Sequence, residues 1–244
     1  MADAFTYAPA IVLLPFLSFL IAVAVGASGR DVLPKGGAIP GIAATAGSLV
    51  LSAWVALAVA GGDVYDETLY EWAAAAGATE GTIELTFGLL LDPLSAMMLV
   101  IVSLVATLVH VFSLGYMNDE GETGLPRYYA GLGLFTASML GFVVSDNLLQ
   151  SFVFFELVGL CSYLLIGFHF REPGPPSAAK KAFLVTRFGD YFFLVGLVGI
   201  VATFGTAQFA GSDAFPHLAE LALTSGESTE TAIRTFGFAP ETWF

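Results

Sequence analysis

Six long apolar runs separated by polar stretches dominate the pattern of this sequence. Each run is about 20 residues long and does not alternate between apolar and polar positions, which favours membrane-spanning helices over the strands of a barrel. Lipid cannot satisfy backbone polar groups, so only helices and closed barrels span a membrane. We therefore predict an all-α, polytopic bundle of about six spans. The predicted spans are approximately residues 8–27, 38–60, 89–114, 128–145, 148–170 and 182–204.

The polar stretches predict what lies between and after the spans. Residues 61–88 carry six acids and no base, and the segment TIELTFGL within them alternates like a strand, which predicts a small hairpin outside the membrane. Asp92 and Pro93 suit the start of the third span as a cap and a first helical residue. The tail contains PHLAELAL, a predicted short interfacial helix. Three parts follow: 1–88 with two spans and the acidic loop, 89–208 with the core spans three to six, and 209–244 as an extracytoplasmic tail that stops before a seventh span.

Composition agrees with a membrane protein and narrows the classes of function. The 244 residues are 57% hydrophobic and 12% charged, about half the charge of a soluble domain. The net charge of -13 argues against binding to nucleic acid or to anionic lipid. The single cysteine, Cys161, excludes an internal disulfide and Cx2C-type sites. A conventional membrane enzyme is disfavoured because HExxH, P-loop and GxSxG motifs do not occur in a suitable context.

The positions of the bases predict the orientation in the membrane. Loops on the cytoplasmic side of membrane proteins carry an excess of Lys and Arg. Six of the eight bases follow the first, third and fifth predicted spans, which places these loops in the cytoplasm and the N-terminus and hairpin outside. These six bases are Arg30, Lys35, Arg127, Arg171, Lys180 and Lys181.

Acids inside the fifth and sixth spans are the first candidates for function. Glu156 follows Asn147 by nine residues, and Asp190 follows Lys181 by nine, so both lie roughly 13 Å from opposite ends of antiparallel helices, near the middle of the bilayer. A charge at that depth costs about 2.5–3.5 kcal/mol on insertion scales. A glutamate lowers this cost by taking a proton, and a nearby cation such as Arg187 opposes that. Such a carboxyl is suited to load and release protons.

Each of these residues also has a purely structural interpretation. Glu156 could be a static partner in a buried ion pair, and Arg187 and Asp190, three residues apart on one helical face, could simply neutralise each other. His110 ends a polar stripe with Ser103 and Thr107 on the third span, and a hydrogen-bonded structural histidine is favoured over a proton relay there. Gly131 and Gly133 are interpreted as packing glycines.

Four segments together resemble a known family. They are LDPLSAMM (91–98), LVHVFSLGYM (108–117), DNLLQSFVFFELVGLCSYLLIGF (146–168) and KKAFLVTRFGD (180–190). The sequence resembles the antiporter-like, largest distal membrane-arm subunit of respiratory complex I and its relative, the large subunit of multisubunit cation/proton antiporters. The resemblance covers about residues 87–199, and its last two segments are long and specific.

The resemblance implies which residues act. The family's channel glutamate falls on Glu156, although Phe154 and Phe155 replace the usual Gly-Trp before it, and the family's sixth-span acid and arginine fall on Asp190 and Arg187. In the family the glutamate pairs with a lysine on a seventh span. The lysines here are Lys35, Lys180 and Lys181, all at or near loops, so the sequence looks like the N-terminal piece of a longer protein or one product of a split gene.

The resemblance also implies a function. It is proton translocation coupled to quinone reduction elsewhere in a complex, with Glu156 as protonatable switch, Arg187 and Asp190 tuning it, and His110 on a connecting path. No redox cofactor is expected in this chain, because it offers no ligands for haem or iron–sulfur. Expected partners are other membrane-arm subunits, the lipid bilayer, and protons or sodium; the expected location is the plasma membrane of a prokaryote. The alternatives are a sodium/proton antiporter subunit and a non-conducting scaffold.

Overall fold

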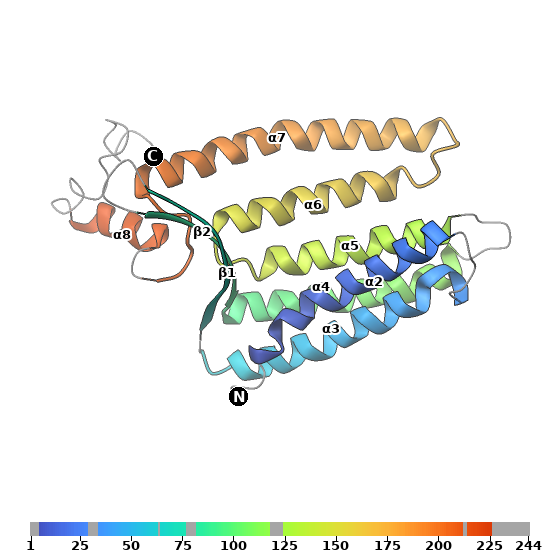
Figure 1. The fold of residues 1–244 in the computed structure, drawn as a ribbon, viewed down its shortest axis with the longest axis horizontal. Coiled ribbons are helices and arrows are strands. Elements are labelled where there is room, and N and C mark those ends of the chain that lie inside the picture. The colour runs from blue at the N-terminus through green and yellow to red at the C-terminus, as the bar shows by residue number, and fades with distance from the viewer. Residues whose placement is uncertain are drawn as a thin grey trace. The chain divides into compact units, whose positions relative to one another are not determined.

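The chain folds into two compact units of helices with one small hairpin. The computed structural model describes residues 5–28, 34–62, 64–76, 82–117, 124–211 and 214–225. The first unit comprises Met1–Tyr65, Leu91–Val144 and Phe154–Thr186, and the second comprises Asp66–Leu90, Ser145–Val153 and Arg187–Phe244. The elements (Figure 1) are α2 (Ala8–Ser28), η1 (Pro34–Gly37), α3 (Ala38–Val59), β1 (Tyr65–Ala76), β2 (Thr82–Leu91), α4 (Pro93–Tyr116), α5 (Leu125–Val143), α6 (Leu148–Ile166), α7 (Gly174–Phe204) and α8 (Phe215–Ser225).

Every predicted span corresponds to a helix, so the predicted all-α membrane fold is confirmed. Two span starts were wrong by four residues or more, and the fifth span ends at Ile166 instead of 170. The third span begins at Pro93 instead of 89, because β2 of the hairpin continues through Leu91. The sixth span begins at Gly174, since the segment GPPSAAKK, predicted as part of a turn, forms the first turns of α7. Proline is tolerated in a first helical turn, where its missing N–H has no partner to lose.

Within the described residues, five helices are long and apolar enough to cross a membrane: α2, α3, α4, α6 and α7. The fourth predicted span, α5, is a helix of 19 residues but does not belong to this set. Its position explains its composition, because α5 packs against α2, α3 and α4 within the first unit and ten of its residues are buried. A helix enclosed by other helices does not need the strongly apolar surface that lipid requires.

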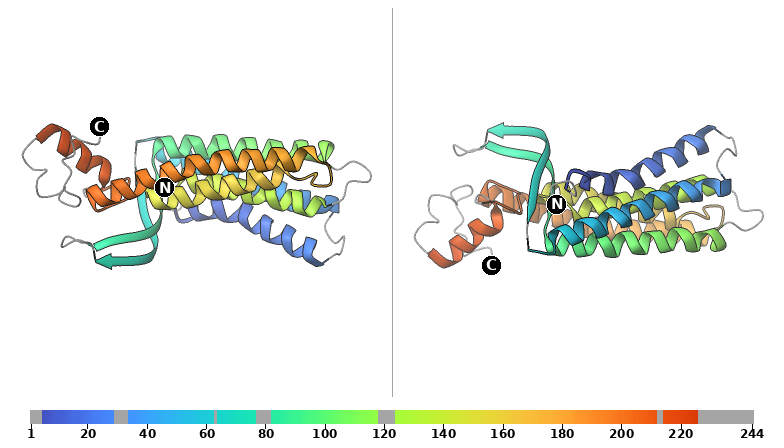
Figure 2. Two further views of the ribbon diagram at one scale, coloured as in Figure 1. Left: turned by 90° about the horizontal axis from the view of Figure 1, so that it is seen from above. Right: turned by 90° about the horizontal axis from the view of Figure 1, so that it is seen from below.

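Small residues allow α2 and α5 to approach closely. A Cβ added to Gly133 would lie 2.8 Å from Ser18 Oγ and 3.2 Å from the Pro15 carbonyl oxygen. A Cβ on Gly131 would lie 3.2 Å from Leu165 of α6. The interpretation of both residues as packing glycines is therefore confirmed. Figure 2 shows that α2 runs obliquely across its neighbours in the first unit, a geometry that small contact residues permit.

The end of α2, the start of α5 and the end of α6 lie together in the first unit. Gly26 at the end of α2, Pro126 at the start of α5 and Leu165 near the end of α6 line one apolar groove. The turn between α6 and α7 follows, and a Cβ on Gly167 would lie 3.3 Å from that of Ala179. This grouping is what the orientation deduced from the bases requires, because loops on one side of the membrane must meet at one end of the bundle.

The second unit contains the hairpin and the junction between α5 and α6. Strands β1 and β2 form a two-stranded sheet, which confirms the predicted hairpin. Asn147 pairs with Gln208 in an isolated antiparallel bridge, and the Leu148 N–H donates to the Ala207 carbonyl over 2.9 Å. The predicted tail helix is confirmed as α8.

Candidate functional site

Glu156 lies at the middle of α6. It follows the first residue of the helix, Leu148, by eight positions and precedes the last, Ile166, by ten. At about 1.5 Å per residue it is roughly 12 Å from one helix end and 15 Å from the other. Its side chain is half-buried in the first unit. α6 is therefore a helix apolar enough to cross a membrane that carries one acid at its centre.

Arg187 and Asp190 form an ion pair on α7 in the second unit. One guanidinium nitrogen of Arg187 lies 3.3 Å from Asp190 Oδ2, and the two side chains are 21% and 11% exposed. Asp190 follows Gly174 by 16 positions and precedes Phe204 by 14, so the pair also lies near the middle of its helix. Glu156 belongs to the first unit, and its predicted relation to the ion pair stays a prediction.

His110 lies in the interior of the first unit, between α3, α4 and α5. The ring is fully buried, and Nδ1 contacts the Ala106 carbonyl oxygen at 2.8 Å. Its ring centre lies 6.5 Å from that of Tyr129, and a Cβ on Gly41 would lie 2.8 Å from its Cδ2. Nε2 has no hydrogen-bond partner among the described residues. The contact of Nδ1 thus supports a structural role for His110, while Nε2 is the nitrogen that could exchange a proton.

The rest of the polar stripe on α4 is bonded within its own helix. Ser103 Oγ donates to the Leu99 carbonyl over 2.7 Å, and Thr107 Oγ1 donates to the Ser103 carbonyl over the same distance. One turn beyond His110, Ser113 Oγ lies 2.9 Å from the Tyr128 hydroxyl of α5. A relay through this stripe would need water between the side chains, because each hydroxyl already bonds to backbone.

A buried cluster of amides and one acid in the second unit was not predicted from the sequence. Asp146 is 2% exposed, and its Oδ1 accepts a 2.6 Å hydrogen bond from the Asn147 amide. The same amide also donates to the Thr86 carbonyl of β2 over 2.8 Å. Gln150 bonds both the N–H and the carbonyl of Gly88, each over 3.0 Å. The sequence feature that could have revealed this cluster is Asp146-Asn147, followed one helical turn later by Gln150, at the boundary between two spans. The sequence analysis interpreted this boundary only as a tight turn.

Burial raises the pKa of the Asp146 carboxyl above its ordinary value of 3.8, and the negative charge of Asp66 on β1 raises it further. The hydrogen bond from Asn147 acts in the opposite direction. Burial also raises the pKa of Asp66. Burial and the nearby charge of Asp66 thus favour the protonated form of Asp146.

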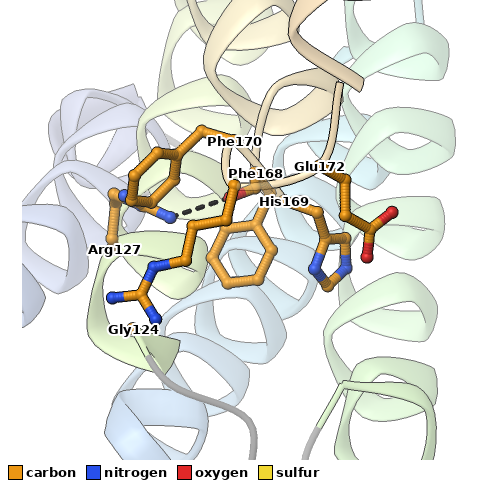
Figure 3. Close-up of a pocket in the computed structure, with 7 residues that line it drawn as sticks. Gly124, Arg127, Phe168, His169, Phe170 and Glu172 are labelled. Atoms are coloured by element: carbon orange, nitrogen blue, oxygen red, sulfur yellow. Dashed lines mark hydrogen bonds between the residues drawn. The ribbon is translucent and has the colours of Figure 1, made fainter. Parts of the chain in front are cut away.

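A polar pocket of about 430 Å³ opens at the end of the first unit where α5 begins and α6 ends (Figure 3). One terminal nitrogen of Arg127 donates to the Phe168 carbonyl over 2.8 Å. The guanidinium carbon lies 5.0 Å from the ring centre of Phe168 and 4.6 Å from that of Phe170. Figure 3 shows the Phe168 ring between Arg127 and His169. Within the described part of the chain, no three His, Cys, Asp or Glu residues are grouped to hold a metal ion.

Two family models match the chain, one over β2 and α4 and one over α6, α7 and α8. Residues 78–129 match the N-terminus of chain 5 of NADH-ubiquinone oxidoreductase (complex I), and residues 145–233 match the transmembrane region of NADH:quinone oxidoreductase and Mrp antiporter subunits. The chain belongs to the antiporter-like subunit family of complex I and Mrp antiporters. The second match contains Glu156, Arg187 and Asp190, so the family resemblance deduced from the sequence is confirmed.

Curated members of the antiporter-like family share substantial identity with this chain. It is 46% identical over 187 residues to the F(420)H(2) dehydrogenase subunit L of Methanosarcina mazei, covering 76% of this chain and 26% of that protein. It is 39% identical over 210 residues to the NADH-quinone oxidoreductase subunit L of Neisseria meningitidis, covering 85% of this chain and 30% of that protein. The chain therefore spans about a third or less of the length of these relatives.

Solved structures of respiratory and antiporter complexes contain the same fold. A chain of the membrane-bound sulfane sulfur reductase, an archaeal respiratory membrane complex, matches with a TM-score of 0.66 at 17% identity over 93% of this chain and 42% of that one. A chain of the Mrp complex from Dietzia sp. matches with a TM-score of 0.63 at 25% identity over 91% of this chain and 22% of that one. The chain is a multi-pass membrane protein of this family.

Proposed function

We propose that this chain is the proton-translocating region of an antiporter-like subunit in a respiratory complex that reduces quinone, in the plasma membrane of a prokaryote. One observation carries the proposal: Glu156 is an acid at the centre of α6, inside the family match that covers residues 145–233. An ionisable group at that depth is costly and is kept where it serves transport. In this proposal the chain transfers protons, and the redox centres lie in other subunits of the complex.

Each polar residue has a distinct role in this proposal. Glu156 takes up and releases the proton. The Arg187–Asp190 ion pair, with its net charge near zero, sets the local field, and its opening or closing changes the proton affinity of the glutamate. His110 connects the path to water through Nε2, the ring nitrogen with no hydrogen-bond partner among the described residues.

The decisive experiment replaces Glu156 in the assembled complex. Inside-out membrane vesicles carrying Glu156→Gln should keep electron transfer from donor to quinone, while acidification of the vesicle interior, followed with a pH-sensitive dye, falls to the background without donor. Glutamine keeps the size and hydrogen-bonding ability of the side chain but cannot take part in proton transfer. Glu71→Gln removes an exposed charge on β1 and should leave acidification unchanged. Normal acidification in Glu156→Gln vesicles contradicts the proposal.

A sodium/proton antiporter subunit is the second candidate, favoured by the match to the Mrp complex at 25% identity. The two functions differ in their energy source. A quinone-linked pump acidifies vesicles only when an electron donor is supplied, whereas an antiporter exchanges protons when a sodium gradient is imposed without donor. A scaffold would do neither through this chain, and Glu156→Leu would then leave all ion fluxes of the complex unchanged.

A further inference from the structure

An apolar groove in the first unit has no role in the proposed proton path. It has a volume of about 470 Å³ and lies between the end of α2, the start of α5 and the end of α6. Apart from the cation at its mouth, small and aliphatic side chains dominate its walls. They include Ala22, Ala27, Ala130, Leu134, Leu164 and Leu165.

The mouth of the groove is positively charged. Gly124, Arg127 and Phe168 line both the groove and the polar pocket of Figure 3, so the two cavities meet at Arg127. Arg171 lines the polar side as a second cation, and its guanidinium carbon lies 5.8 Å from the Phe170 ring centre. Among the described residues that line the two cavities, Glu172 is the one acid.

The rings of Phe168 and Phe170 hold Arg127 in place. They contact the guanidinium at its carbon, and the Phe168 carbonyl accepts one of its N–H groups. A guanidinium has five N–H donors in a fixed plane, and a fork of such donors matches the oxygens of a phosphate. A ligand for this site therefore has an anionic phosphate joined to a slender apolar chain.

We propose that this groove binds one phospholipid with an anionic headgroup, its acyl chain between α2, α5 and α6 and its phosphate at Arg127. Basic pockets between transmembrane helices on the cytoplasmic side bind such headgroups, and the bases of this chain predict that side here. The net charge of -13 predicts no general attraction to anionic membranes. The site acts locally, through Arg127 and Arg171, which stand against one acid among the described lining residues.

The site can be tested on the protein purified in a mild detergent, without reference to proton flux. Native mass spectrometry would measure the binding of dioleoyl phosphatidylglycerol, dioleoyl phosphatidylcholine and inorganic phosphate. Phosphatidylglycerol should bind about tenfold more tightly than phosphatidylcholine, because both lipids offer a phosphate to Arg127 but the choline cation of phosphatidylcholine is repelled by Arg127 and Arg171. Arg127→Gln should weaken the binding of both lipids and reduce this preference. Lys181→Gln removes an exposed charge on α7 outside the pocket and should change nothing.

A second pair of variants tests the acyl chain. Ala27→Trp places a ring in the groove from an exposed position and should weaken both lipids, whereas Ala24→Trp, also exposed on α2 but outside the groove lining, should not. Equal binding of the two lipids, or equal behaviour of Arg127→Gln and Lys181→Gln, overturns the proposal. Two results together would also overturn it: inorganic phosphate displaces phosphatidylglycerol, and Ala27→Trp binds the lipid as well as Ala24→Trp does. They would indicate a site for free anions.

Discussion

The carboxylate of Asp146 occupies the space that a side chain at position 88 would need. A Cβ built on Gly88 would overlap Asp146 Oδ2 and would lie 2.7 Å from its Cγ and 2.8 Å from the Glu67 carbonyl oxygen. Gln150 bonds both backbone groups of Gly88, so the strand cannot shift away without losing two hydrogen bonds. Glycine at position 88 is therefore a condition for the buried acid.

Gly88→Ala should destabilise the second unit. Alanine must displace the Asp146 carboxylate or break the pairing with Gln150, and overpacking of this kind costs about 1–3 kcal/mol. Thermal unfolding in detergent, followed by circular dichroism, would measure the change. Gly196→Ala is the matched control, because a Cβ there meets nothing within 4 Å and a helical alanine is favoured over glycine. An unfolding temperature for Gly88→Ala equal to that of the control would contradict the packing argument.

Asp146 should make the protein more stable in mild acid than at neutral pH. Burial and the charge of Asp66 raise the folded-state pKa of the carboxyl above the ordinary value of 3.8. As the pH falls through that raised pKa, the folded state takes up a proton before the unfolded chain does, so the free energy of unfolding rises. The gain amounts to about 1.4 kcal/mol for each pH unit over which only the folded state is protonated, and it is complete below about pH 3.8.

Asp146→Asn isolates this contribution. The asparagine oxygen still accepts from the Asn147 amide, but the side chain carries no charge at any pH. The acid-dependent gain should therefore shrink to the part that Asp66, whose pKa burial also raises, contributes, and stability near pH 7 should increase. Unfolding curves between pH 4 and pH 8 would show the change in slope. Glu71→Gln, an exposed acid on β1, should keep the wild-type slope. If Asp146→Asn keeps that slope too, the raised pKa is not responsible.

Asn147 joins the α5–α6 junction to the hairpin. Its side-chain amide donates to the Thr86 carbonyl and its oxygen accepts from the Gln150 N–H over 2.7 Å. Asn147→Ala leaves these buried groups unpaired at a cost of about 1–3 kcal/mol each. Amide hydrogen exchange of β2 should then speed up at least tenfold. Ser162→Ala on α6 removes a hydroxyl that donates only to its own helix, and serves as the control. If the amide exchange rates of β2 are unchanged in Asn147→Ala, other contacts hold β2 in place.

The helices were predictable from the sequence because lipid permits only a narrow range of solutions. Runs of apolar residues fix where α2, α3, α4, α6 and α7 lie, and Asp92 fixes the start of α4, where its Oδ1 accepts from the Ser95 N–H over 2.6 Å. The boundary errors arose where two structures compete for the same residues. Leu89 and Leu91 are as apolar as a span, yet strand pairing places them in β2.

Only those site residues that stand out individually in the sequence could be predicted. An acid in the middle of an apolar run, such as Glu156, stands out because its burial is costly. The cluster around Asp146 does not stand out in this way, because ordinary polar residues are common in loops. Its partners Thr86 and Gln208 also lie about 60 residues away on either side. The groove at Arg127 likewise depends on three helices meeting, which no local pattern encodes.

Gly41 should control the position of His110. A Cβ on Gly41 would lie 2.8 Å from the ring Cδ2 and 3.2 Å from Nε2, in a fully buried setting with Tyr129 on another side. Gly41→Ala must therefore push the ring or separate α3 from α4, at a cost of about 1–3 kcal/mol. Gly115→Ala, on the same helix as His110 with open space at its Cβ, is the control for the gain in helix propensity. Nitrogen-15 spectra of labelled histidine would report the environment of Nε2, and we expect its resonance to shift in Gly41→Ala and not in Gly115→Ala. Identical histidine spectra in the two variants would show that α3 does not hold the ring, and His110 would then have no fixed position from which to pass a proton.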